Sequence, residues 1–566
     1  MPDSSIIPVL IVGAGPVGLI AALTLRKNGV PVRIIEKDSR VHVGQRGAAI
    51  MPRTQEIYKS LGILDDIHAK ATPMNQVRMY RLPDGVEPLT TFVVEPGAEP
   101  SPARPYRNTS MLGQDHTEEI LRTHIGRYDC QVEFGTALAG FRPEDGYVLA
   151  HVVKMVGDKE ILEIIKCRWL IGTDGARGIV RKQLGLAFNG ETLGATHHMV
   201  IGDIEMKGLD NKYWHYWGDM STIMVMLRAT EDDGIYFLFI GGHIDHAKVV
   251  AERAELERVI RIGTGRTDIQ LGKVRYVAQY RPHVRMAVNF GKGRVLIAGD
   301  AAHIHSPFGG QGLNSGVQDA VNLAWKLSLV EKGVAAPLLL DTYAEERIPV
   351  IAEMLKATTK LFDSAMHVKA WDSANTEKAW RRGGELHMFG VNYRWSSIVV
   401  DERTPKEEIP VDPYGVSYSA TDIVRAGDRA PNAPGLIILD STGGQQRTTA
   451  TSLFDIFGPS YHTVMVFCDG TDKPDQIWSC LGAYPLEILR KVLVCARSDD
   501  TRSWANIVNA DVAVVDRDAH VHAGYQVQED ELVVIIVRPD GMIGGIVRSA
   551  HGVKQYFDGV FGAFSG

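Results

Sequence analysis

A glycine-rich segment near the N-terminus, residues 13–18, constrains the fold more than any other part of this sequence. It follows an apolar run at residues 8–12, which is expected to form a buried strand, and it opens a helical pattern over residues 17–27. A second apolar run at residues 31–36 completes a strand–helix–strand unit with parallel strands. This spacing predicts a dinucleotide-binding fold, in which the helix N-terminus faces a pyrophosphate.

Three glycines and one acid in this unit have separate tasks. Gly13 permits the tight turn, Gly15 lets a pyrophosphate approach the backbone, and Gly18 lets the helix and strand pack closely. Glu36, at the end of the second strand, is placed to accept hydrogen bonds from a ribose hydroxyl. Its charge also disfavours a 2′-phosphate, so NADP is not the expected occupant of this site.

A second element, the Gly299-Asp300 step, lies far downstream at the end of an apolar run at residues 295–298. An aspartate at the carboxyl end of a strand can reach a ligand hydroxyl when small residues follow it. The helical pattern that begins near Gly312 presents free backbone N–H groups to an electron-rich acceptor. The edge of a flavin, which gains negative charge on reduction, suits such a helix start. The two elements together point to FAD and an oxidative enzyme.

Length and composition limit the class of protein. A chain of 566 residues is expected to form two or three domains, and a net charge of −7 argues against nucleic acid or an anionic membrane as partner. Five cysteines without paired spacing indicate a reduced, cytoplasmic setting. The apolar stretch at residues 6–25 has no basic residue before it and is interrupted by glycines. A buried strand and helix therefore explain this stretch better than a signal peptide or membrane anchor.

A third strand end carries Asp174-Gly175, followed by Arg177, which alone could be an ordinary turn. Taken with the fingerprint and the Gly299-Asp300 step, it resembles the class A flavoprotein monooxygenases, aromatic hydroxylases that include p-hydroxybenzoate hydroxylase and phenol hydroxylase. The resemblance covers about residues 6–385 and extends to Asp319 and Asn322 in the downstream helix.

The resemblance implies a set of cofactor-binding residues. Asp300 would bind the ribityl chain of FAD. Gly312, Leu313 and Asn314 would meet the flavin pyrimidine edge with backbone N–H groups. The remaining implied contacts are Arg46 and Gln114, for the phosphates and adenosine half of FAD, and Asp174, for both FAD and NAD(P)H.

The expected fold class is α/β: a Rossmann-like FAD-binding domain with an inserted mixed-sheet substrate domain and a thioredoxin-like C-terminal domain. The C-terminal resemblance is to the phenol hydroxylase subgroup, but no Cys-x-x-Cys occurs, so we expect a structural or oligomer-forming role. The predicted boundaries are 1–75, 107–190 and 289–385 for the FAD-binding domain, 76–106 and 191–288 for the substrate domain, 396–435 for a linker, and 436–566 for the C-terminal domain.

The candidate catalytic residues are Tyr280 and Pro307, the tyrosine because it aligns with one that phenol hydroxylase-like members place near the substrate. A tyrosine at a strand end is more often simply packed there. In the run 213–217, His215 and Tyr216 could line an aromatic pocket, since alternate residues of a strand face one side. The same run could instead be sheet core, with His215 satisfied by a neighbour.

Two other features of the substrate region can be read from the sequence. Phenol hydroxylase has an active-site aspartate where this chain has Ala48 and Ala49, so a base that deprotonates the substrate must come from elsewhere. His197, His198 and His243 lack the spacing of ligands, and we expect no metal site.

By resemblance, the protein takes a hydride from NADPH or NADH, and the reduced flavin captures O2 as a C4a-hydroperoxide that hydroxylates a small phenolic substrate. The resemblance also implies a homodimer without a nucleic-acid or membrane partner. Decarboxylative hydroxylation and Baeyer–Villiger oxygenation use the same scaffold and stay open as alternatives. A flavin-dependent halogenase and a non-catalytic flavin-binding partner protein fit less well, the latter because the flavin-edge motif is intact.

Overall fold

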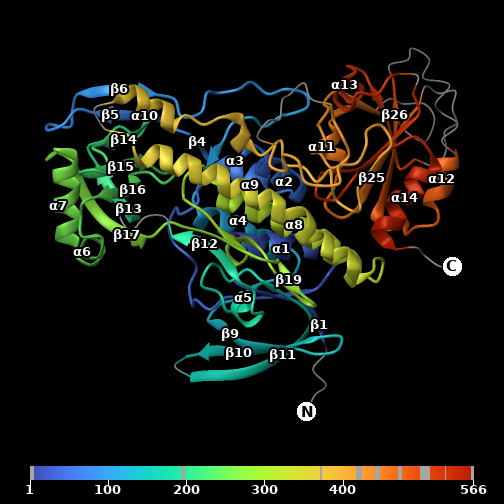
Figure 1. The fold of residues 1–566 in the computed structure, drawn as a ribbon, viewed down its shortest axis with the longest axis horizontal. Coiled ribbons are helices and arrows are strands. Elements are labelled where there is room, and N and C mark those ends of the chain that lie inside the picture. The colour runs from blue at the N-terminus through green and yellow to red at the C-terminus, as the bar shows by residue number, and fades with distance from the viewer. Residues whose placement is uncertain are drawn as a thin grey trace.

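The structure is a computed structural model. It describes residues 6–157, 159–192, 198–369, 372–415, 423–439, 447–468, 475–496, 510–529 and 531–562. His197, named above as a non-ligand, lies outside these ranges. Three large sheets dominate the fold: a central sheet, a seven-stranded sheet at one end, and a C-terminal sheet at the other (Figure 1).

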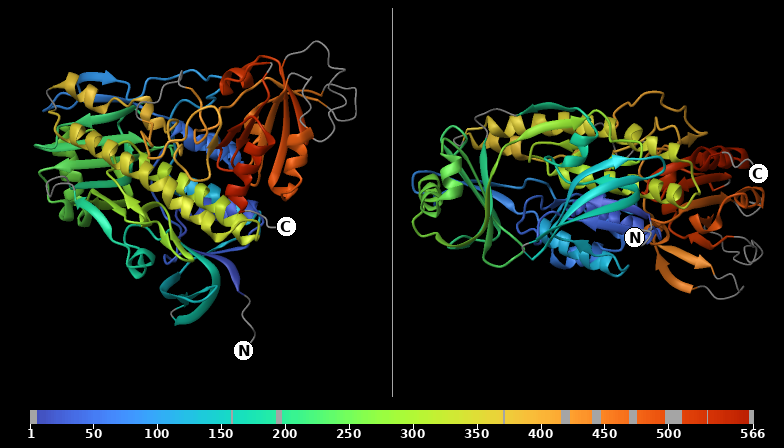
Figure 2. Two further views of the ribbon diagram at one scale, coloured as in Figure 1. Left: turned by 45° about the vertical axis from the view of Figure 1, so that its right-hand side comes forward. Right: turned by 90° about the horizontal axis from the view of Figure 1, so that it is seen from below.

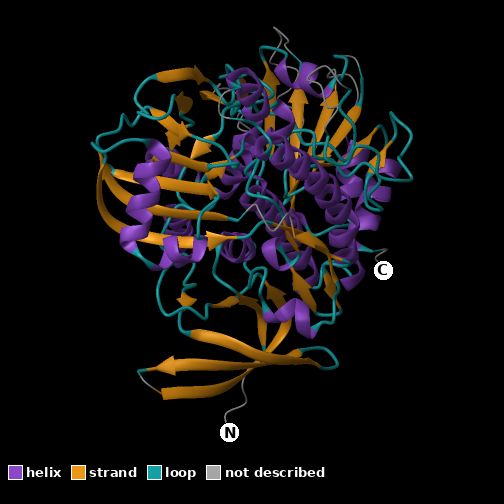
Figure 3. Cartoon of the chain, turned by 60° about the vertical axis from the view of Figure 1, so that its left-hand side comes forward, coloured by secondary structure: helices purple, strands orange, loops and turns teal. Residues whose placement is uncertain are grey.

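The central sheet contains the predicted strand–helix–strand unit. Its strand order is β19-β20-β11-β1-β2-β8, and β1 pairs in parallel with β11 on one side and β2 on the other. Strand β10 pairs with the first half of β11, β9 pairs with β10, and the three strands project as a ribbon near the N-terminus (Figure 3). The strands are β1 (Ile7–Val12), β2 (Val32–Ile35), β8 (Val132–Glu133), β9 (Thr136–Pro143), β10 (Val148–Val156), β11 (Lys159–Gly172), β19 (Gly291–Lys292) and β20 (Val295–Ile297).

Helices cover the central sheet. Helix α1 (Pro16–Lys27) packs against both α4 (Gln114–Gly126) and α8 (Gln311–Glu331). The paired helices α8 and α9 (Asp341–Met366) run between the seven-stranded sheet and the C-terminal unit (Figure 2). The remaining helices of this part are α2 (Pro52–Leu61), α3 (Leu64–Lys70), α5 (Ile179–Gln183), α10 (Ser373–Trp380) and the 3₁₀ helices η1 (Gly299–Ala301), η2 (Pro337–Leu340) and η3 (Gly384–His387).

The seven-stranded sheet has the order β17-β13-β16-β15-β14-β5-β6, so strands from two distant parts of the sequence share it. One face packs against helices α6 (His246–Ala251) and α7 (Arg253–Thr264), and the other face turns toward the central part. Its strands are β5 (Gln76–Tyr80), β6 (Pro88–Phe92), β13 (Met199–Lys207), β14 (Tyr213–Trp217), β15 (Ile223–Ala229), β16 (Ile235–Gly242) and β17 (Gln270–Tyr280).

Two small three-stranded sheets lie between the larger ones, in the orders β12-β18-β21 and β3-β7-β4. Their strands are β12 (Phe188–Thr192), β18 (His283–Ala287), β21 (His303–Ile304), β3 (Ala49–Ile50), β4 (Thr72–Pro73) and β7 (Ser110–Met111).

The C-terminal sheet has the order β22-β29-β28-β25-β26-β27-β23-β24, in which β28 is antiparallel to both β25 and β29 while β26 is parallel to β25. Its strands are β22 (Val400–Asp401), β23 (Leu436–Leu439), β24 (Arg447–Thr451), β25 (His462–Cys468), β26 (Leu489–Cys495), β27 (Val512–Asp516), β28 (Val533–Val537) and β29 (Ile543–Val547). Its helices are α11 (Leu453–Ile456), α12 (Asp475–Leu481), the 3₁₀ helix η4 (Leu486–Ile488), α13 (His520–Tyr525) and α14 (Ala550–Phe561).

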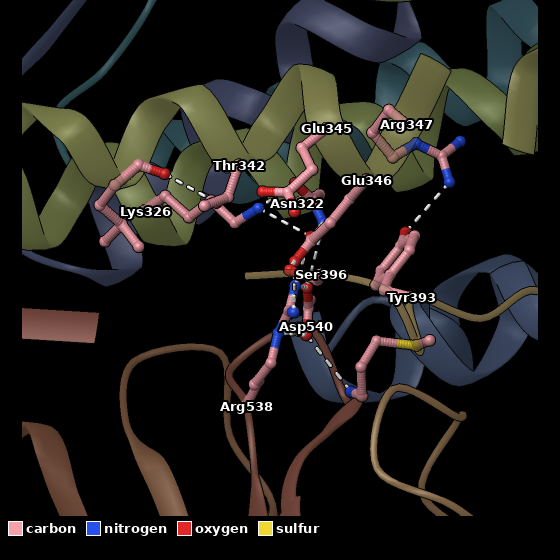
Figure 4. Close-up of polar contacts among 12 residues, drawn as sticks. Asn322, Lys326, Thr342, Glu345, Glu346, Arg347, Tyr393, Ser396, Arg538 and Asp540 are labelled. Carbon is pink, nitrogen blue, oxygen red and sulfur yellow. Dashed lines mark hydrogen bonds and ion pairs between the residues drawn. The ribbon is translucent and has the colours of Figure 1, made fainter. Parts of the chain in front are cut away.

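A buried network of charges joins the C-terminal unit to α8 and α9 (Figure 4). The Glu346 carboxylate of α9 accepts hydrogen bonds from Lys326 at 2.7 Å, from Ser396 at 2.7 Å and from Arg538 at 2.7 and 2.9 Å. Asp540 in turn accepts from the Trp325 indole at 3.1 Å. Every charged group in this network therefore has an opposite charge or a hydrogen-bond partner, as buried ions require.

The segment predicted as a linker, residues 396–435, packs tightly in its described part. Ser396 contacts Glu346, and the fully buried Tyr414 donates a hydrogen bond to Gln311 at the start of α8 at 2.6 Å. It contributes the short strand β22 to the C-terminal sheet, and its polar side chains satisfy buried groups of the central part. Among the described helices, none combines the length and apolar character needed to cross a bilayer.

Candidate active site

A cavity of about 720 Å³ lies where the central sheet, the seven-stranded sheet and the segment around η3 meet. One wall carries the glycine fingerprint, the Gly299-Asp300 step and the start of α8. The opposite wall is the inner face of the seven-stranded sheet. This arrangement brings the two cofactor elements predicted from the sequence to a single space.

Two of the three fingerprint glycines occupy positions where a side chain would clash with the backbone. Gly13 has φ +101°, and a Cβ there would lie 2.5 Å from the Thr173 carbonyl oxygen. A Cβ on Gly18 would lie 2.1 Å from the Gly13 carbonyl oxygen, so helix α1 packs against the turn with no room for a side chain. Gly15 differs, because a Cβ there would meet nothing within 4 Å, and Gly15 lines the cavity. The backbone is thus open at Gly15, where a pyrophosphate would approach.

Glu36 is fixed beside the fingerprint by backbone groups. Its Oε2 accepts a hydrogen bond from the N–H of Ala14 at 2.9 Å, and its Oε1 accepts from the N–H of Asp38 at 3.1 Å. The half-buried carboxylate therefore has a defined orientation at the carboxyl end of β2. Binding of a ribose hydroxyl by Glu36 stays a prediction.

A buried cluster of three charged or polar side chains, Asp319, His303 and Arg347, holds the Gly299-Asp300 turn in place. Asp319 accepts hydrogen bonds from the N–H of Gly299 at 3.1 Å, from His303 at 2.6 Å and from Arg347 at 2.7 Å. Burial alone would raise the pKa of Asp319, but His303 and Arg347 lower it to about 2. Asp300 itself is exposed to the cavity, and desolvation by the protein around the cavity raises its pKa.

Helix α8 begins at the cavity without a side-chain cap. Gly310 precedes it in a left-handed conformation with φ +64°, and Gly312 and Leu313 line the cavity in the first turn. The Asn314 side chain is buried and turned away, since it accepts from the N–H of Met51 at 2.8 Å and donates to the Ala49 carbonyl at 2.9 Å. The first-turn N–H groups therefore remain available for an acceptor in the cavity.

The other predicted cofactor residues separate into two groups. Arg46, with φ +37°, and Gln114, at the start of α4, both line the cavity. Asp174 does not: its Oδ2 accepts from the N–H of Val180 at 3.0 Å, so the side chain caps α5, and neighbouring Gly175 lines the cavity instead. The Oδ1 atom of Asp174 has no hydrogen-bond partner within the described ranges, and a contact of this carboxylate with FAD stays a prediction.

The inner face of the seven-stranded sheet forms an apolar and aromatic wall. The residues that supply it are Trp214, Met226, Phe237 and Phe239 from the sheet, with Phe308 and Trp380 from the side. The indole N–H groups of Trp214 and Trp380 are buried and have no hydrogen-bond partner within the described ranges. A bound molecule with an oxygen acceptor would satisfy them.

The structure corrects the prediction for His215, because strand alternation points this side chain to the opposite face of the sheet. There its ring contacts both Tyr80 and Trp217, and it hydrogen-bonds to the Tyr80 hydroxyl at 2.7 Å and the Asp210 carbonyl at 2.7 Å. Tyr216 faces the cavity side but is buried behind Trp380 and does not line the cavity.

Both candidate catalytic residues, Tyr280 and Pro307, line the cavity. The Tyr280 hydroxyl donates a hydrogen bond to the His305 carbonyl at 3.3 Å, and burial raises the pKa of this tyrosine well above its usual range. The phenol group is therefore neutral at physiological pH. Their catalytic roles stay predictions.

Several lining residues were missed by the sequence reasoning: Glu95 after β6, and Trp380, Arg382 and His387 around η3. They lie in or beside short elements, α10 and η3 among them, that carry no sequence motif. Their one usable signal is a concentration of aromatic and charged residues at 380–389, in a stretch without long apolar runs.

One group of potential metal ligands occurs in the described ranges, formed by Asp115, His116 and Glu231. Glu231 already accepts hydrogen bonds from Gln45 and from the N–H of Gly113. We assign no ion to this group, since acidic clusters are common on protein surfaces.

Comparison with known proteins identifies the chain. Residues 7–358 match the family described as the FAD binding domain. A flavin-dependent monooxygenase of Mycobacteroides abscessus is 31% identical over 97% of this chain and 98% of its own length. The chain belongs to the FAD-dependent monooxygenases.

Other relatives of this FAD-dependent monooxygenase support the same assignment. The pentachlorophenol 4-monooxygenase of Sphingobium chlorophenolicum is 30% identical over 75% of each chain. The fold matches a crystal structure of the flavin-dependent monooxygenase PieE with FAD and substrate, with TM-score 0.79, 22% identity and 99% coverage of both chains. It also matches aklavinone-11 hydroxylase with FAD and aklavinone, with TM-score 0.76, 23% identity and coverage of 99% and 100%. The α/β fold class and the family predicted from the sequence are confirmed.

The residues present fit FAD. The open backbone at Gly15, the carboxylate of Asp300 and the uncapped start of α8 all line the cavity, and these are the groups that would hold the phosphates, the ribityl chain and the flavin edge. When bound and reduced by a nicotinamide, FAD supplies the oxygen-activating chemistry of such an enzyme.

Proposed function

We propose that this enzyme hydroxylates a phenolic aromatic ring, using NADPH or NADH as reductant. The observation that carries the proposal is the cavity with a cofactor-binding wall on one side and an aromatic sheet wall on the other. A flat ring between Trp214 and the start of α8 would stack on apolar side chains, while the unpartnered indole N–H groups of Trp214 and Trp380 would donate hydrogen bonds to its oxygen substituents.

The chain's own groups prepare the reaction in three ways. Gly15, Arg46 and Asp300 hold the cofactor, and the N–H groups at the start of α8 stabilise negative charge on the flavin edge. The aromatic wall excludes water from the reacting atoms. The names of relatives support this substrate class, since they include monooxygenases of pentachlorophenol and para-nitrophenol.

The test is an assay of NADPH and NADH oxidation and oxygen uptake with a panel of phenols, with hydrogen peroxide measured and products identified. A hydroxylated product with little peroxide is the expected result. A lactone would identify a Baeyer–Villiger reaction, and released carbon dioxide a decarboxylative hydroxylation. A purified protein without a flavin spectrum, even after addition of FAD, would overturn the proposal.

For the C-terminal unit we propose a thioredoxin-like fold with a structural role, in a cytoplasmic homodimer. The order β29-β28-β25-β26, with β28 antiparallel to its neighbours, supports this fold. Cys130, Cys167 and Cys480 are free thiols, which agrees with a reducing compartment that also supplies NAD(P)H. Light scattering after gel filtration measures the mass of the assembly directly, and a monomer would contradict the homodimer.

A further inference from the structure

A histidine and a carboxylate from distant segments form a pair in the cavity wall. Nε2 of His387, the last residue of η3, lies 2.6 Å from Oε1 of Glu95, which follows β6. Both residues line the cavity, and their side chains are 15% and 8% exposed. The other oxygen of Glu95 accepts a hydrogen bond from the Thr109 hydroxyl at 2.6 Å. The pair is therefore held in place yet open to a molecule in the cavity.

The hydrogen bond to Glu95 determines which ring nitrogen of His387 is free to accept a proton. Burial alone would raise the pKa of Glu95, but the hydrogen bonds from His387 and Thr109 lower it below its ordinary value. An ionised Glu95 accepts the Nε2–H of His387, which leaves the lone pair on Nδ1. Nδ1 has no hydrogen-bond partner within the described ranges.

Other charged groups near the pair are a cation and an exposed acid. Arg382 precedes η3 and lines the same wall, and burial lowers its pKa to about 10, so it stays charged at neutral pH. Glu385 lies within η3 and is exposed. The charged Arg382 does not compete with His387 for a proton at neutral pH.

The remaining titratable groups of the cavity are poor bases at neutral pH. Tyr280 keeps its proton, and burial lowers the pKa of His305 to about 4. Burial and then nearby arginines also lower the pKa of His283. Asp300 lies on the cofactor wall, across the cavity from the aromatic sheet. Of the three histidines that line the cavity, His283, His305 and His387, the described contacts pair His387 with a carboxylate.

We propose that His387 is the base that deprotonates the phenolic substrate, with Glu95 as the residue that positions it. The O–H bond of the phenol breaks, its electron pair stays on the oxygen as phenolate, and an N–H bond forms at Nδ1. The Glu95 carboxylate stabilises the resulting imidazolium, as the acid of a catalytic triad does. Phenolate is the more electron-rich ring, so the transfer prepares it for hydroxylation. This inference rests on the proposed function.

The experiment uses the FAD-loaded enzyme without NAD(P)H and two coloured probes, 4-nitrophenol and 4-nitro-1-naphthol, whose neutral and ionised forms absorb differently. Equilibrium dialysis gives the bound amount, and absorbance from pH 5 to 9 gives the ionised fraction of the bound probe. In the wild type the bound probe should ionise at a lower pH than the free probe. His387→Gln should shift this midpoint upward by about one pH unit, a tenfold change in the ionisation constant. Glu95→Gln should shift it in the same direction by less.

Control variants separate the possible failures. His551→Gln, at an exposed histidine of α14, should ionise the bound probe like the wild type. FAD absorbance and the urea unfolding midpoint show whether each variant is folded. A folded His387→Gln that binds the probe with wild-type ionisation overturns this inference alone, and the same result for Glu95→Gln overturns the positioning role. If the FAD-loaded wild type binds neither probe, the proposed function fails and the inference fails with it.

Discussion

Glu346 and Arg538 form a two-point ion pair at 2.7 and 2.9 Å, with both side chains fully buried, although 192 residues separate them. Burial alone would raise the pKa of Glu346, but Arg538 and Lys326 hold it far below its ordinary value. Burial likewise opposes the charge of Arg538, yet Asp540 and Glu346 raise its pKa well above the usual range. Both groups stay charged inside the protein, at the contact between α9 and the C-terminal sheet (Figure 4).

Arg538→Met should therefore destabilise the protein by about 3–5 kcal/mol, because Glu346 and Asp540 would lose their main cationic partner inside the protein. The measurement is the urea unfolding midpoint of the FAD-loaded enzyme. Arg548→Met is the matched control, since Arg548 pairs with Glu531 at 2.6 Å on the surface and is 53% exposed. That change should cost about 0–1 kcal/mol. Equal effects of the two substitutions would contradict the structural role given to Arg538.

The fingerprint glycines should respond differently to alanine. Gly18→Ala places a methyl group 2.1 Å from the Gly13 carbonyl oxygen, so the protein should fold poorly with or without FAD. Gly15→Ala meets open space and should fold normally, but its methyl group should obstruct the cofactor. Far-UV circular dichroism and fluorescence titration with FAD distinguish the two. A Gly15→Ala protein that binds FAD as tightly as wild type would refute the assignment of this backbone to the pyrophosphate.

Asp300→Ala should weaken FAD binding roughly ten- to hundredfold, which is the loss of a hydrogen bond to a charged group of about 1.5–3 kcal/mol. The carboxylate opens onto the cavity and lies above the supporting His303–Asp319 pair. Isothermal titration of the deflavinated protein with FAD measures the change. Asp145→Ala, in an exposed turn between β9 and β10, serves as the control and should bind FAD normally.

Tyr280→Phe should keep FAD and reduce coupling, meaning the share of NAD(P)H oxidation that yields hydroxylated product. The substitution removes the hydroxyl that donates to His305 and leaves the packing intact, a loss of about 1 kcal/mol and so roughly a fivefold change. Peroxide release per NAD(P)H reports the uncoupling. Tyr236→Phe removes a similar hydroxyl, bonded to the Leu209 carbonyl on the far side of the sheet, and should leave coupling unchanged. Normal coupling in Tyr280→Phe would remove this residue from the catalytic set.

The buried His462 should lower the free energy of unfolding of the protein in mild acid. It is fully buried among Trp325, Tyr556 and Phe557, neither ring nitrogen has a partner in the described part of the chain, and burial lowers its pKa to about 3. The unfolded chain binds a proton near pH 6.5 and the folded protein does not. Stability is therefore full above pH 6.5 and falls as the pH drops toward 3, by ~2 kcal/mol at pH 5.

His462→Phe should remove this part of the pH dependence, so that the variant loses less stability than the wild type between pH 7.5 and 5. Urea unfolding at several pH values between these limits measures it. His551→Phe, at an exposed histidine of α14, should keep the wild-type slope. Parallel curves for wild type and His462→Phe would show that His462 is not neutral and unpaired in the folded state.

The parts of the fold that follow from local pattern were predictable. Strand β1, helix α1 and strand β2 agree with the predicted segments, because apolar periodicity and glycine spacing act over a few residues. The start of α8 at Gln311 follows from the glycines before it. The direction of the His215 side chain could not be predicted from the strand pattern. Alternation predicts which residues share a face of the sheet, but not which face meets the cavity.

The missed residues depend on contacts between distant segments. His387 and Glu95 are 292 residues apart, and neither belongs to a motif, so only the folded chain brings them together. The Asp174 side chain is a different case. The Asp-Gly step was recognised from the sequence, but the short helix α5, whose Val180 N–H donates to this carboxylate, was not predicted. Such sites require tertiary structure.

The buried pair of Glu346 and Arg538 also has a consequence for folding during synthesis. Helix α9 leaves the ribosome long before Arg538 is made, and until then Glu346 has only Lys326 as a cationic partner. The flavin-binding half therefore reaches its final stability only after nearly the whole chain has been translated.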